Sequence, residues 1–422
     1  MLGFFLMRFK PFRGLRPRRD LASKVPSYPY DVIDTEGARK LAEGDPYTFL
    51  HVVKPEIDLE PGSSPYDDRV YDKGRQNFHA MIEQGWLFRD ERPSYYVYRL
   101  EMGDHSQRGF VGVAAIDDYL EGTIKKHELT RQDKEQDRVR HMEALSAHAG
   151  PVLQAYGRVP ELSAEANSIT AGDPEVDFVS PDGIRHSLWV VGEREAVERI
   201  QDLFSRVPCS YIADGHHRTA AAAEVALKRR REGSAGEDAP HDFFLTVLFP
   251  SHQLRILDYN RLVRDLNGLD PAGFLERVRK AGFEIKEGHQ ARRPPHKRSF
   301  GMYLGRSWYL LTTAGTEREE KDPSKRLDVA VLSNRLLDPI LGIGDIRTDR
   351  RIDFVGGIHG IEELERRVDS GDYAAAFAIY PTAMEEVLSV ADAGKVMPPK
   401  STWFEPKLRS GMVVHSLDKL HH

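Results

Sequence analysis

The sequence predicts an α+β fold in which mixed β-sheets are flanked by helices. Apolar, β-branched and aromatic runs alternate with helix-like segments, but the regular strand–helix–strand repeat of a parallel sheet is missing. Two pairs of runs are separated by turn residues and predict hairpins, 95–102 with 108–116 and 299–304 with 308–313. Purely helical and regularly alternating α/β architectures are therefore disfavoured.

The 422 residues are enough for two domains, each with a core of its own. Segment 233–240 is rich in Gly, Ala, Pro and acidic residues, which is typical of a boundary or a flexible loop. We expect a first domain at 8–232 and a second α+β domain at 241–422, which ends in a strap.

In the first half, capping residues, terminating glycines and apolar spacing predict the helices, and short apolar runs predict the strands. The expected helices are 34–43, 71–84, 131–148, 193–204 and 219–228. Besides the first hairpin, the expected strands are 48–53, 151–156, 176–180, 185–191 and 210–213. The charges of segment 131–148 are typical of a solvated helix face.

The same signals continue in the second half. Besides the second hairpin, apolar runs predict strands at 243–249, 255–259, 352–355 and 374–379. Helices are expected at 271–280, at 327–341 with an interruption at Pro339, after the Gly-rich turn 356–360, and at 382–390. The tail 397–411 fits neither a helix nor a regular strand.

Composition bounds the class of protein. The net charge is −6, which argues against broad nucleic-acid binding. No apolar run approaches the ~20 residues that a membrane-spanning helix needs. The single cysteine, Cys209, has no intrachain partner, so a reducing compartment is the simple interpretation. We expect a cytoplasmic protein that works at neither a membrane nor a nucleic acid.

The central motif follows the apolar run 210–213. Asp214-Gly215 breaks the run, His216, His217 and Arg218 follow, and an alanine-rich helix is expected from Thr219. A strand, a Gly turn and a helix start together present backbone N–H groups at the positive end of a helix dipole, which favours phosphate. Arg218 adds a planar donor suited to phosphate oxygens. The alternatives are an ordinary capped helix with polar surface residues, and a metal site that uses the histidines.

Two further stretches carry candidate functional residues. His127 and Glu128 lie at an expected strand-to-helix junction, with Arg138 two turns into the helix. The tail contains Lys400 and Arg409 among Ser, Thr and aromatic residues, and is suited to closing over a phosphate site. The alternatives are a capped, solvated helix in the first case and a structural strap in the second.

Several segments together resemble the bacterial family of domain of unknown function 1015. These segments are Phe-Arg-Gly-Leu-Arg-Pro at 12–17, Lys-His-Glu-Leu-Thr at 126–130, Ala-Asp-Gly-His-His-Arg at 213–218, Met-Pro-Pro-Lys-Ser-Thr at 397–402 and Pro-Lys-Leu-Arg at 406–409. The 214–218 turn is similar to the nucleotide-phosphate motif of the ParB/sulfiredoxin superfamily. Its best match is the Asp-Gly-x-His-Arg form of a free-serine kinase. Sulfiredoxin has its catalytic thiol where this chain has His216, which excludes that chemistry.

The resemblance implies a ParB/sulfiredoxin-like core and a nucleotide-dependent small-molecule kinase that phosphorylates free serine or a related hydroxy amino acid. Its cofactor would be ATP or ADP with magnesium. The expected catalytic residues are Glu128, Asp214 and His216, and the expected nucleotide ligands are Gly215, His217, Arg218, Thr219, Arg138, Lys400 and Arg409. The alternatives are a non-catalytic nucleotide-binding regulator of the ParB type, with the basic run 228–231 as a contact, and a metal-dependent hydrolase.

Overall fold

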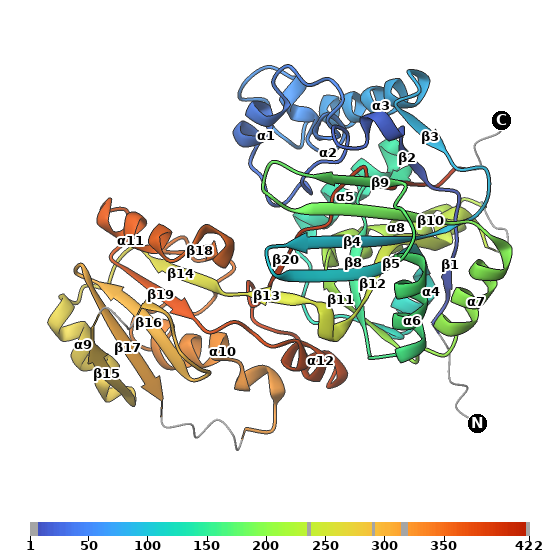
Figure 1. Cartoon of the computed structure of the whole chain (residues 1–422). Coiled ribbons are helices and arrows are strands. Elements are labelled where there is room, and N and C mark those ends of the chain that lie inside the picture. The colour runs from blue at the N-terminus through green and yellow to red at the C-terminus, as the bar shows by residue number, and fades with distance from the viewer. Residues whose placement is uncertain (1–6, 234–237, 289–291, 314–319, 419–422) are drawn as a thin grey trace. The chain divides into compact units, whose positions relative to one another are not determined.

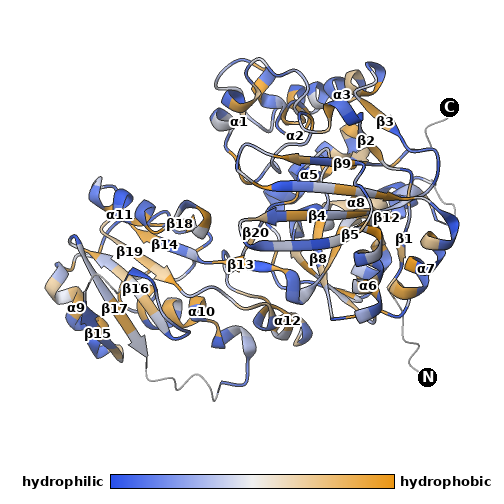
Figure 2. Ribbon diagram, in the orientation of Figure 1, coloured by the Kyte–Doolittle hydropathy of each residue, from blue (hydrophilic) through white to orange (hydrophobic). Residues whose placement is uncertain are grey.

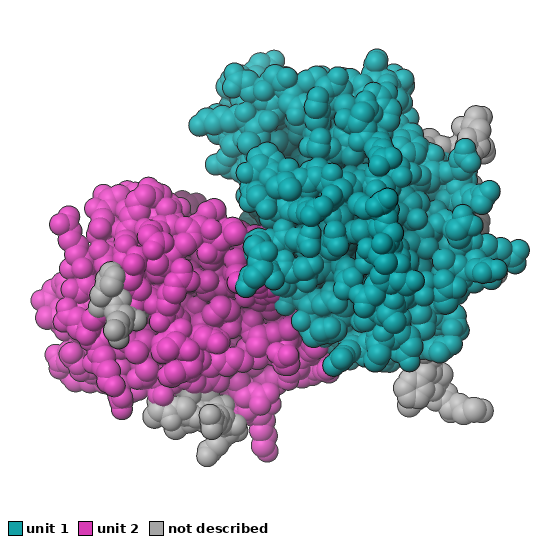
Figure 3. Space-filling model, in the orientation of Figure 1, with its two compact units in different colours: residues 1–126, 130–254, 406–422 teal, residues 127–129, 255–405 magenta. Residues whose placement is uncertain are grey.

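The structure is a computed structural model that describes residues 7–233, 238–288, 292–313 and 320–418. It divides into two compact units, coloured separately in Figure 3. Unit 1 comprises residues 1–126, 130–254 and 406–422, and unit 2 comprises 127–129 and 255–405. Unit 2 therefore lies within the sequence of unit 1, whose last segment returns after it. Most of the expected boundary segment, residues 234–237, falls outside the described residues.

Unit 1 is built on a nine-stranded mixed sheet (Figure 1). The strands follow the order β6-β11-β8-β12-β5-β4-β10-β9, and β1 pairs with β5. Their bounds are Ile124–Lys125 (β6), Ser210–Asp214 (β11), Val152–Tyr156 (β8), Phe243–Pro250 (β12), His105–Ala115 (β5), Tyr95–Met102 (β4), Arg185–Val191 (β10), Val176–Val179 (β9) and Phe9–Lys10 (β1). The pairs β11–β6 and β12–β8 are parallel and the others antiparallel, which confirms the predicted mixed sheet.

Each helix of unit 1 has buried residues. The helices are Thr35–Ala42 (α1), Leu50–Val53 (α2), Asp68–Glu83 (α3), Ile116–Leu120 (α4), Gln132–Leu145 (α5), Pro160–Ile169 (α6), Arg194–Phe204 (α7) and His216–Arg231 (α8). Figure 2 shows hydrophobic and hydrophilic residues sharing the ribbon of α7, where Ile200 and Phe204 are buried. Short strands also pair at Leu15–Pro17 (β2) with Leu87–Arg89 (β3), and at Ala147–His148 (β7) with His415–Ser416 (β21).

Two predictions for unit 1 are wrong in detail. Residues 48–53 form no strand but end in helix α2, in which Leu50, Val52 and Val53 are buried. Periodicity does not separate a strand from a helix in so short an apolar run. Helix α5 does not present a fully solvated charged face, because Asp137 and Arg138 on it are buried.

Unit 2 contains a six-stranded antiparallel sheet in the order β15-β17-β16-β19-β14-β18. Its strands are Phe283–Glu287 (β15), Ser307–Thr313 (β17), Ser299–Leu304 (β16), Ala375–Ile379 (β19), Tyr259–Val263 (β14) and Ile352–Gly356 (β18). Arg255–Leu257 (β13) pairs with Trp403–Glu405 (β20). The helices are Pro271–Lys280 (α9), Asp328–Leu332 (α10), which continues as a π-helical turn to Leu337, Glu362–Asp369 (α11) and Met384–Asp392 (α12). Both units are thus α+β, as expected. Among the described residues no helix is long and apolar enough to cross a membrane.

Candidate functional site

The central motif lies where strand β11 passes into helix α8. Residues 210–213 are buried in the sheet, and the pairing register with β8 shifts between Ile212 and Asp214. Gly215 then takes the left-handed conformation, with φ 102° and ψ 29°. Glycine adopts this conformation without the penalty that a Cβ brings. The strand–turn–helix prediction is confirmed, but the helix begins at His216 and not at Thr219, so both histidines and Arg218 lie on its first turn.

The positive end of the dipole of helix α8 lies at this turn. The first backbone bond of α8 runs from Thr219 N–H to the Gly215 carbonyl at 3.0 Å, and the Thr219 hydroxyl donates to the same oxygen at 3.2 Å. As at every helix start, the backbone N–H groups of the residues before Thr219 lie outside the ladder of hydrogen bonds within the helix. Helix α8 has sixteen residues, long enough for a full helix dipole. The turn therefore has the backbone arrangement that binds anions.

Arg218 folds back over the turn. A Cβ placed on Gly215 would lie 3.2 Å from both Nε and Cζ of Arg218, so the guanidinium covers the glycine. One end of the guanidinium donates to the Pro151 carbonyl, and Nη2 lies 3.8 Å from Asp214 Oδ2. The side chain is 8% exposed, and within the described part of the chain its Nε has no hydrogen-bond partner. One donor of this buried cation thus remains for an anion at the turn.

Lys407 is a member of this site that the sequence did not indicate. It lies on the last segment of unit 1, and its Nζ is 3.4 Å from Asp214 Oδ2. Burial alone would raise the pKa of Asp214, but the charges of Lys407 and Arg218 outweigh it and hold that pKa well below its usual range. Asp214 is therefore ionised at neutral pH, which makes it a weak general base.

Arg138 reaches the same region from helix α5, which packs against α8. Its guanidinium stacks on the Tyr30 ring at 3.8 Å and pairs with Asp137 at 2.6 Å. Burial raises the pKa of the Tyr30 phenol, and the charges of Arg138 and Arg218 act in the opposite direction. The Tyr30 phenol thus lies within electrostatic range of both guanidinium groups.

The two histidines differ in surroundings. His216 is 5% exposed, and its charge contributes to lowering the pKa of Asp214. His217 accepts a hydrogen bond at Nε2 from the N–H of Arg131, the residue that precedes helix α5, at 3.0 Å. That bond fixes the proton of neutral His217 on Nδ1 and ties the start of α5 to the start of α8.

Arg409 lies in a buried network of unit 1. Its guanidinium bonds to Ser180 at 3.1 Å, to His186 at 3.3 Å and to the Asp182 carboxylate, and it stacks on Tyr28 at 4.0 Å. The side chain is 2% exposed. These contacts anchor the segment that carries Lys407. Arg409 is therefore a residue that positions this segment.

Glu128 and Lys400 belong to unit 2, so their roles at the Gly215 turn stay predictions. Glu128 is half-buried in the loop between β6 and α5. Lys400 is exposed, and its Nζ lies 5.6 Å from the centre of the Tyr259 ring.

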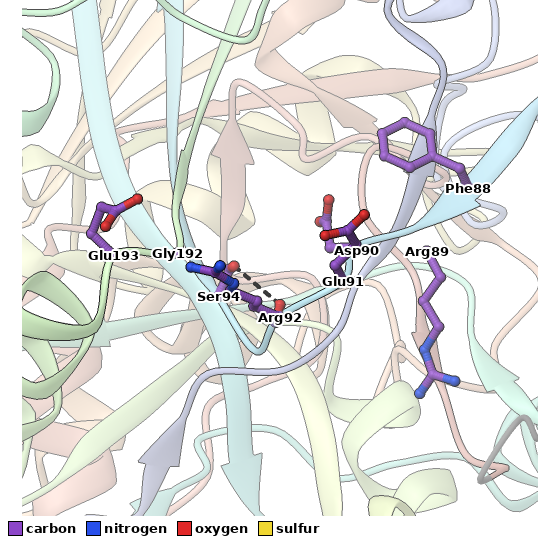
Figure 4. A pocket seen from close by; sticks show the side chains of 8 residues that line it. All are labelled: Phe88, Arg89, Asp90, Glu91, Arg92, Ser94, Gly192 and Glu193. Carbon is purple, nitrogen blue, oxygen red and sulfur yellow. Dashed lines mark hydrogen bonds between the residues drawn. The ribbon is translucent and has the colours of Figure 1, made fainter. Parts of the chain in front are cut away.

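A cavity of about 440 Å³ occurs elsewhere in unit 1 (Figure 4). Its lining consists of Phe88, Arg89, Asp90, Glu91, Arg92, Ser94, Gly192 and Glu193. None of these was predicted as a site residue. The carboxylate of Asp90 is already bonded to Arg16 and to the Tyr96 hydroxyl.

The basic run on which the ParB-type alternative depends is largely paired with acidic side chains of this protein. In the basic run 228–231, three side chains form internal ion pairs: Lys228 with Glu143, Arg229 with Asp418, and Arg230 with Asp117 and Asp242. Across the described ranges, no group of three or more His, Cys, Asp or Glu side chains is arranged to hold a metal ion.

Residues 9–330 match the family described as a protein of unknown function, DUF1015. The chain belongs to this family. The match confirms the family that the resemblance indicated, and segments 397–402 and 406–409 lie beyond the matched residues. Comparison with curated proteins gives no match.

Several solved structures are similar in parts. A free serine kinase in complex with AMP is 16% identical, with 70% of this chain and 86% of that chain covered and a TM-score of 0.36. A conserved hypothetical protein from Pyrococcus furiosus is 16% identical, with 70% and 90% covered and a TM-score of 0.33. SbnI from Staphylococcus aureus, with a C-terminal truncation, is 10% identical, with 74% and 90% covered and a TM-score of 0.40.

Proposed function

We propose that unit 1 binds the phosphates of ATP or ADP at the Gly215 turn and transfers a phosphoryl group to the hydroxyl of a small molecule, free serine or a related hydroxy amino acid. The observation that carries the proposal is the position of Arg218. A buried guanidinium, whose Nε has no hydrogen-bond partner among the residues that the structure describes, covers a left-handed glycine at the start of a sixteen-residue helix. Helix dipole, backbone donors and a planar cation together suit a phosphate.

The surrounding charges support phosphoryl transfer over simple anion storage. Arg138 and Lys407 add positive charge around the turn, and such fixed charges stabilise the phosphoryl group in the transition state. Thr219 is fully buried and is held to the Gly215 carbonyl, so its role is to fix the turn.

Asp214 fits a positioning role better than that of the proton acceptor. Its pKa is held low by Lys407 and Arg218, whereas an efficient general base has a pKa near the working pH. In the proposed reaction the ionised carboxylate orients Lys407. Glu128 is the proton acceptor that the resemblance implies, and this role stays a prediction.

Magnesium fits this site only as a metal held mainly by the nucleotide. Asp214 supplies one ionised carboxylate, and Mg²⁺ is commonly bound by one or two carboxylates together with phosphates and water. When bound, Mg²⁺ would neutralise phosphate charge. The protein groups that bind and orient the phosphates are Arg218, Arg138 and Lys407.

The test is a product assay with purified full-length protein. Protein, Mg²⁺ and either ATP or ADP are incubated with L-serine, L-threonine or L-homoserine, and phosphorylated products are sought by mass spectrometry. The proposal predicts one phosphorylated amino acid whose formation depends on Arg218. Nucleotide binding without a product from any of these acceptors would reject the hydroxy amino acids, and absence of both binding and product would reject the kinase.

A further inference from the structure

Unit 2 contains a completely buried cation, Arg261 on strand β14. Its side chain is 0% exposed. The guanidinium donates to the Tyr259 carbonyl, its Nη2 lies 3.5 Å from the Pro399 carbonyl oxygen, and Cζ lies 5.3 Å from the centre of the Phe354 ring. Neutral carbonyls and a ring do not balance a full positive charge in a low-dielectric interior.

Arg261 also lacks a carboxylate partner. Within the described ranges, no Asp or Glu oxygen lies within 4.0 Å of the guanidinium, and Nε has no hydrogen-bond partner. Burial lowers the pKa of Arg261 to about 10. Other arginines of the same unit are paired, for example Arg298 with Asp328 and Arg351 with Asp349. An unbalanced buried charge is costly, so it points to a ligand that supplies the missing negative charge.

A loop passes over this guanidinium and is fixed at both of its ends. The N–H of Met397 donates to the His127 carbonyl at 2.7 Å, and Thr382 Oγ1 donates to the Ser401 carbonyl at 2.8 Å. Between them, Pro398 and Pro399 have no N–H groups to bond elsewhere. The loop ends are therefore anchored in unit 2, and within the loop the Ser401 hydroxyl donates to the Pro398 carbonyl.

The apex of this loop combines a weak contact with a strained lysine. The Arg261–Pro399 contact, at 3.5 Å, is at the limit of a hydrogen bond. Lys400 has φ 58°, a left-handed conformation that a residue with a Cβ rarely takes, and its side chain is exposed. Strain of this kind persists where surrounding structure or function requires it.

We propose that Arg261 and the 398–401 loop form a binding site for a phosphate group. The apex lifts, the Pro399 carbonyl leaves Nη2, and phosphate oxygens take its place on Nη2 and Nε while the Lys400 ammonium approaches from the loop. An anion is a stronger partner for a guanidinium than a carbonyl dipole, and two cations match the two charges of a phosphate. All of these residues belong to unit 2, so the inference does not depend on the Gly215 turn.

Hydrogen exchange followed by mass spectrometry tests this site locally in the full-length protein. Inorganic phosphate is titrated against sodium chloride of the same ionic strength, and exchange is read from peptides that span 395–405. At a phosphate concentration about four times Kd, a phosphate-bound form whose loop amides resist exchange slows exchange about fivefold. Phenyl phosphate is the second probe. Protection by both probes assigns the site to phosphate monoesters, and protection by inorganic phosphate alone assigns it to the free ion.

Three variants complete the test. Arg218→Met alters only the site at the Gly215 turn and is expected to keep the protection at 395–405. Arg261→Met is expected to lose this protection. Lys400→Ala changes an exposed side chain and is expected to fold normally. It should weaken phosphate binding about tenfold, which is typical of losing one charged contact. If Arg261→Met does not fold, Lys400→Ala carries the test. Equal protection by sodium chloride, no protection at all, or full protection in both unit 2 variants would overturn the proposal.

Discussion

The Asp214 carboxylate and the Lys407 ammonium lie 3.4 Å apart, although 193 residues separate them in the sequence. The last segment of the chain thus completes the charge balance of the turn that holds Gly215. Lys407→Met should leave the half-buried Asp214 with Arg218 and His216 as its remaining cationic neighbours, and lower the free energy of unfolding by about 1–3 kcal/mol.

Urea unfolding measures this loss, and a double-mutant cycle with Asp214→Asn isolates the pair. The double variant should recover most of the stability, because it leaves no unpaired carboxylate. If the two single losses simply add, the ion pair does not couple these residues.

The backbone at Gly215 should be essential for ligand binding. Gly215→Ala combines φ 102° with a Cβ only 3.2 Å from the Arg218 guanidinium, so the side chain must move away from the turn. We expect stability to fall by about 1–2 kcal/mol and nucleotide affinity by at least about tenfold. Isothermal titration calorimetry and urea unfolding measure the two effects.

Gly122→Ala is the matched control for this change. Gly122 has φ 86°, and a Cβ there meets no heavy atom within 4 Å. It should show the conformational cost without the loss of affinity. Equal affinities of the two variants would contradict the role given to Arg218.

Arg409→Met should destabilise unit 1 through Asp182. The substitution removes a guanidinium that bonds to Ser180, Asp182 and His186, and leaves the half-buried carboxylate without its cation. We expect a loss of about 3 kcal/mol in urea unfolding, slightly below that of a fully buried pair. Arg194→Met, which alters an exposed i,i+4 pair, should change stability by no more than about 0.5 kcal/mol. A similar effect of both variants would speak against the anchoring network.

Stability should fall as the pH drops from about 6.5 toward 4. Burial lowers the pKa of His141 and of His415 to about 4 and that of His186 to about 3, from an ordinary 6.5, and it holds the pKa of His148 well below that value. In this window the unfolded chain takes up protons that the folded protein does not, so each histidine reduces the free energy of unfolding by up to about 1.4 kcal/mol per pH unit. Urea unfolding at several pH values measures the slope. His141→Gln should reduce it by about one quarter, and a flat profile between these pH values would contradict the buried, neutral state of the four rings.

The local part of the site was predictable, and the distant part was not. The buried run, the glycine and the alanines between 210 and 223 specify a strand, a turn and a helix by short-range rules. The contacts of Lys407 with Asp214 and of Tyr30 with Arg138 join segments far apart in the sequence, and no periodicity or spacing encodes such pairs. The burial of Asp137 and Arg138 within a charged helix was missed for the same reason, because Tyr71, which bonds to Asp137, and Tyr30, which stacks on Arg138, lie on other segments.

The fold class could be predicted from the irregular alternation of strands and helices in the sequence. The pairing of strand β12 with β5 and β8 could not. Strand β12 follows the Gly- and Pro-rich segment 233–240, yet it lies in the sheet of unit 1. A flexible-looking segment in the sequence indicates a loop, but only tertiary packing decides which sheet the next strand joins.

Nucleotide titration of Arg218→Met against wild type, by isothermal titration calorimetry with ATP and with ADP, tests the central claim most directly. Arg194→Met serves as the control for loss of an arginine elsewhere. The proposed site predicts that wild type and the control bind the nucleotide equally and that Arg218→Met binds at least about tenfold more weakly, with its unfolding transition retained. Equal binding by all three proteins, or binding by none, would contradict a phosphate site at the Gly215 turn.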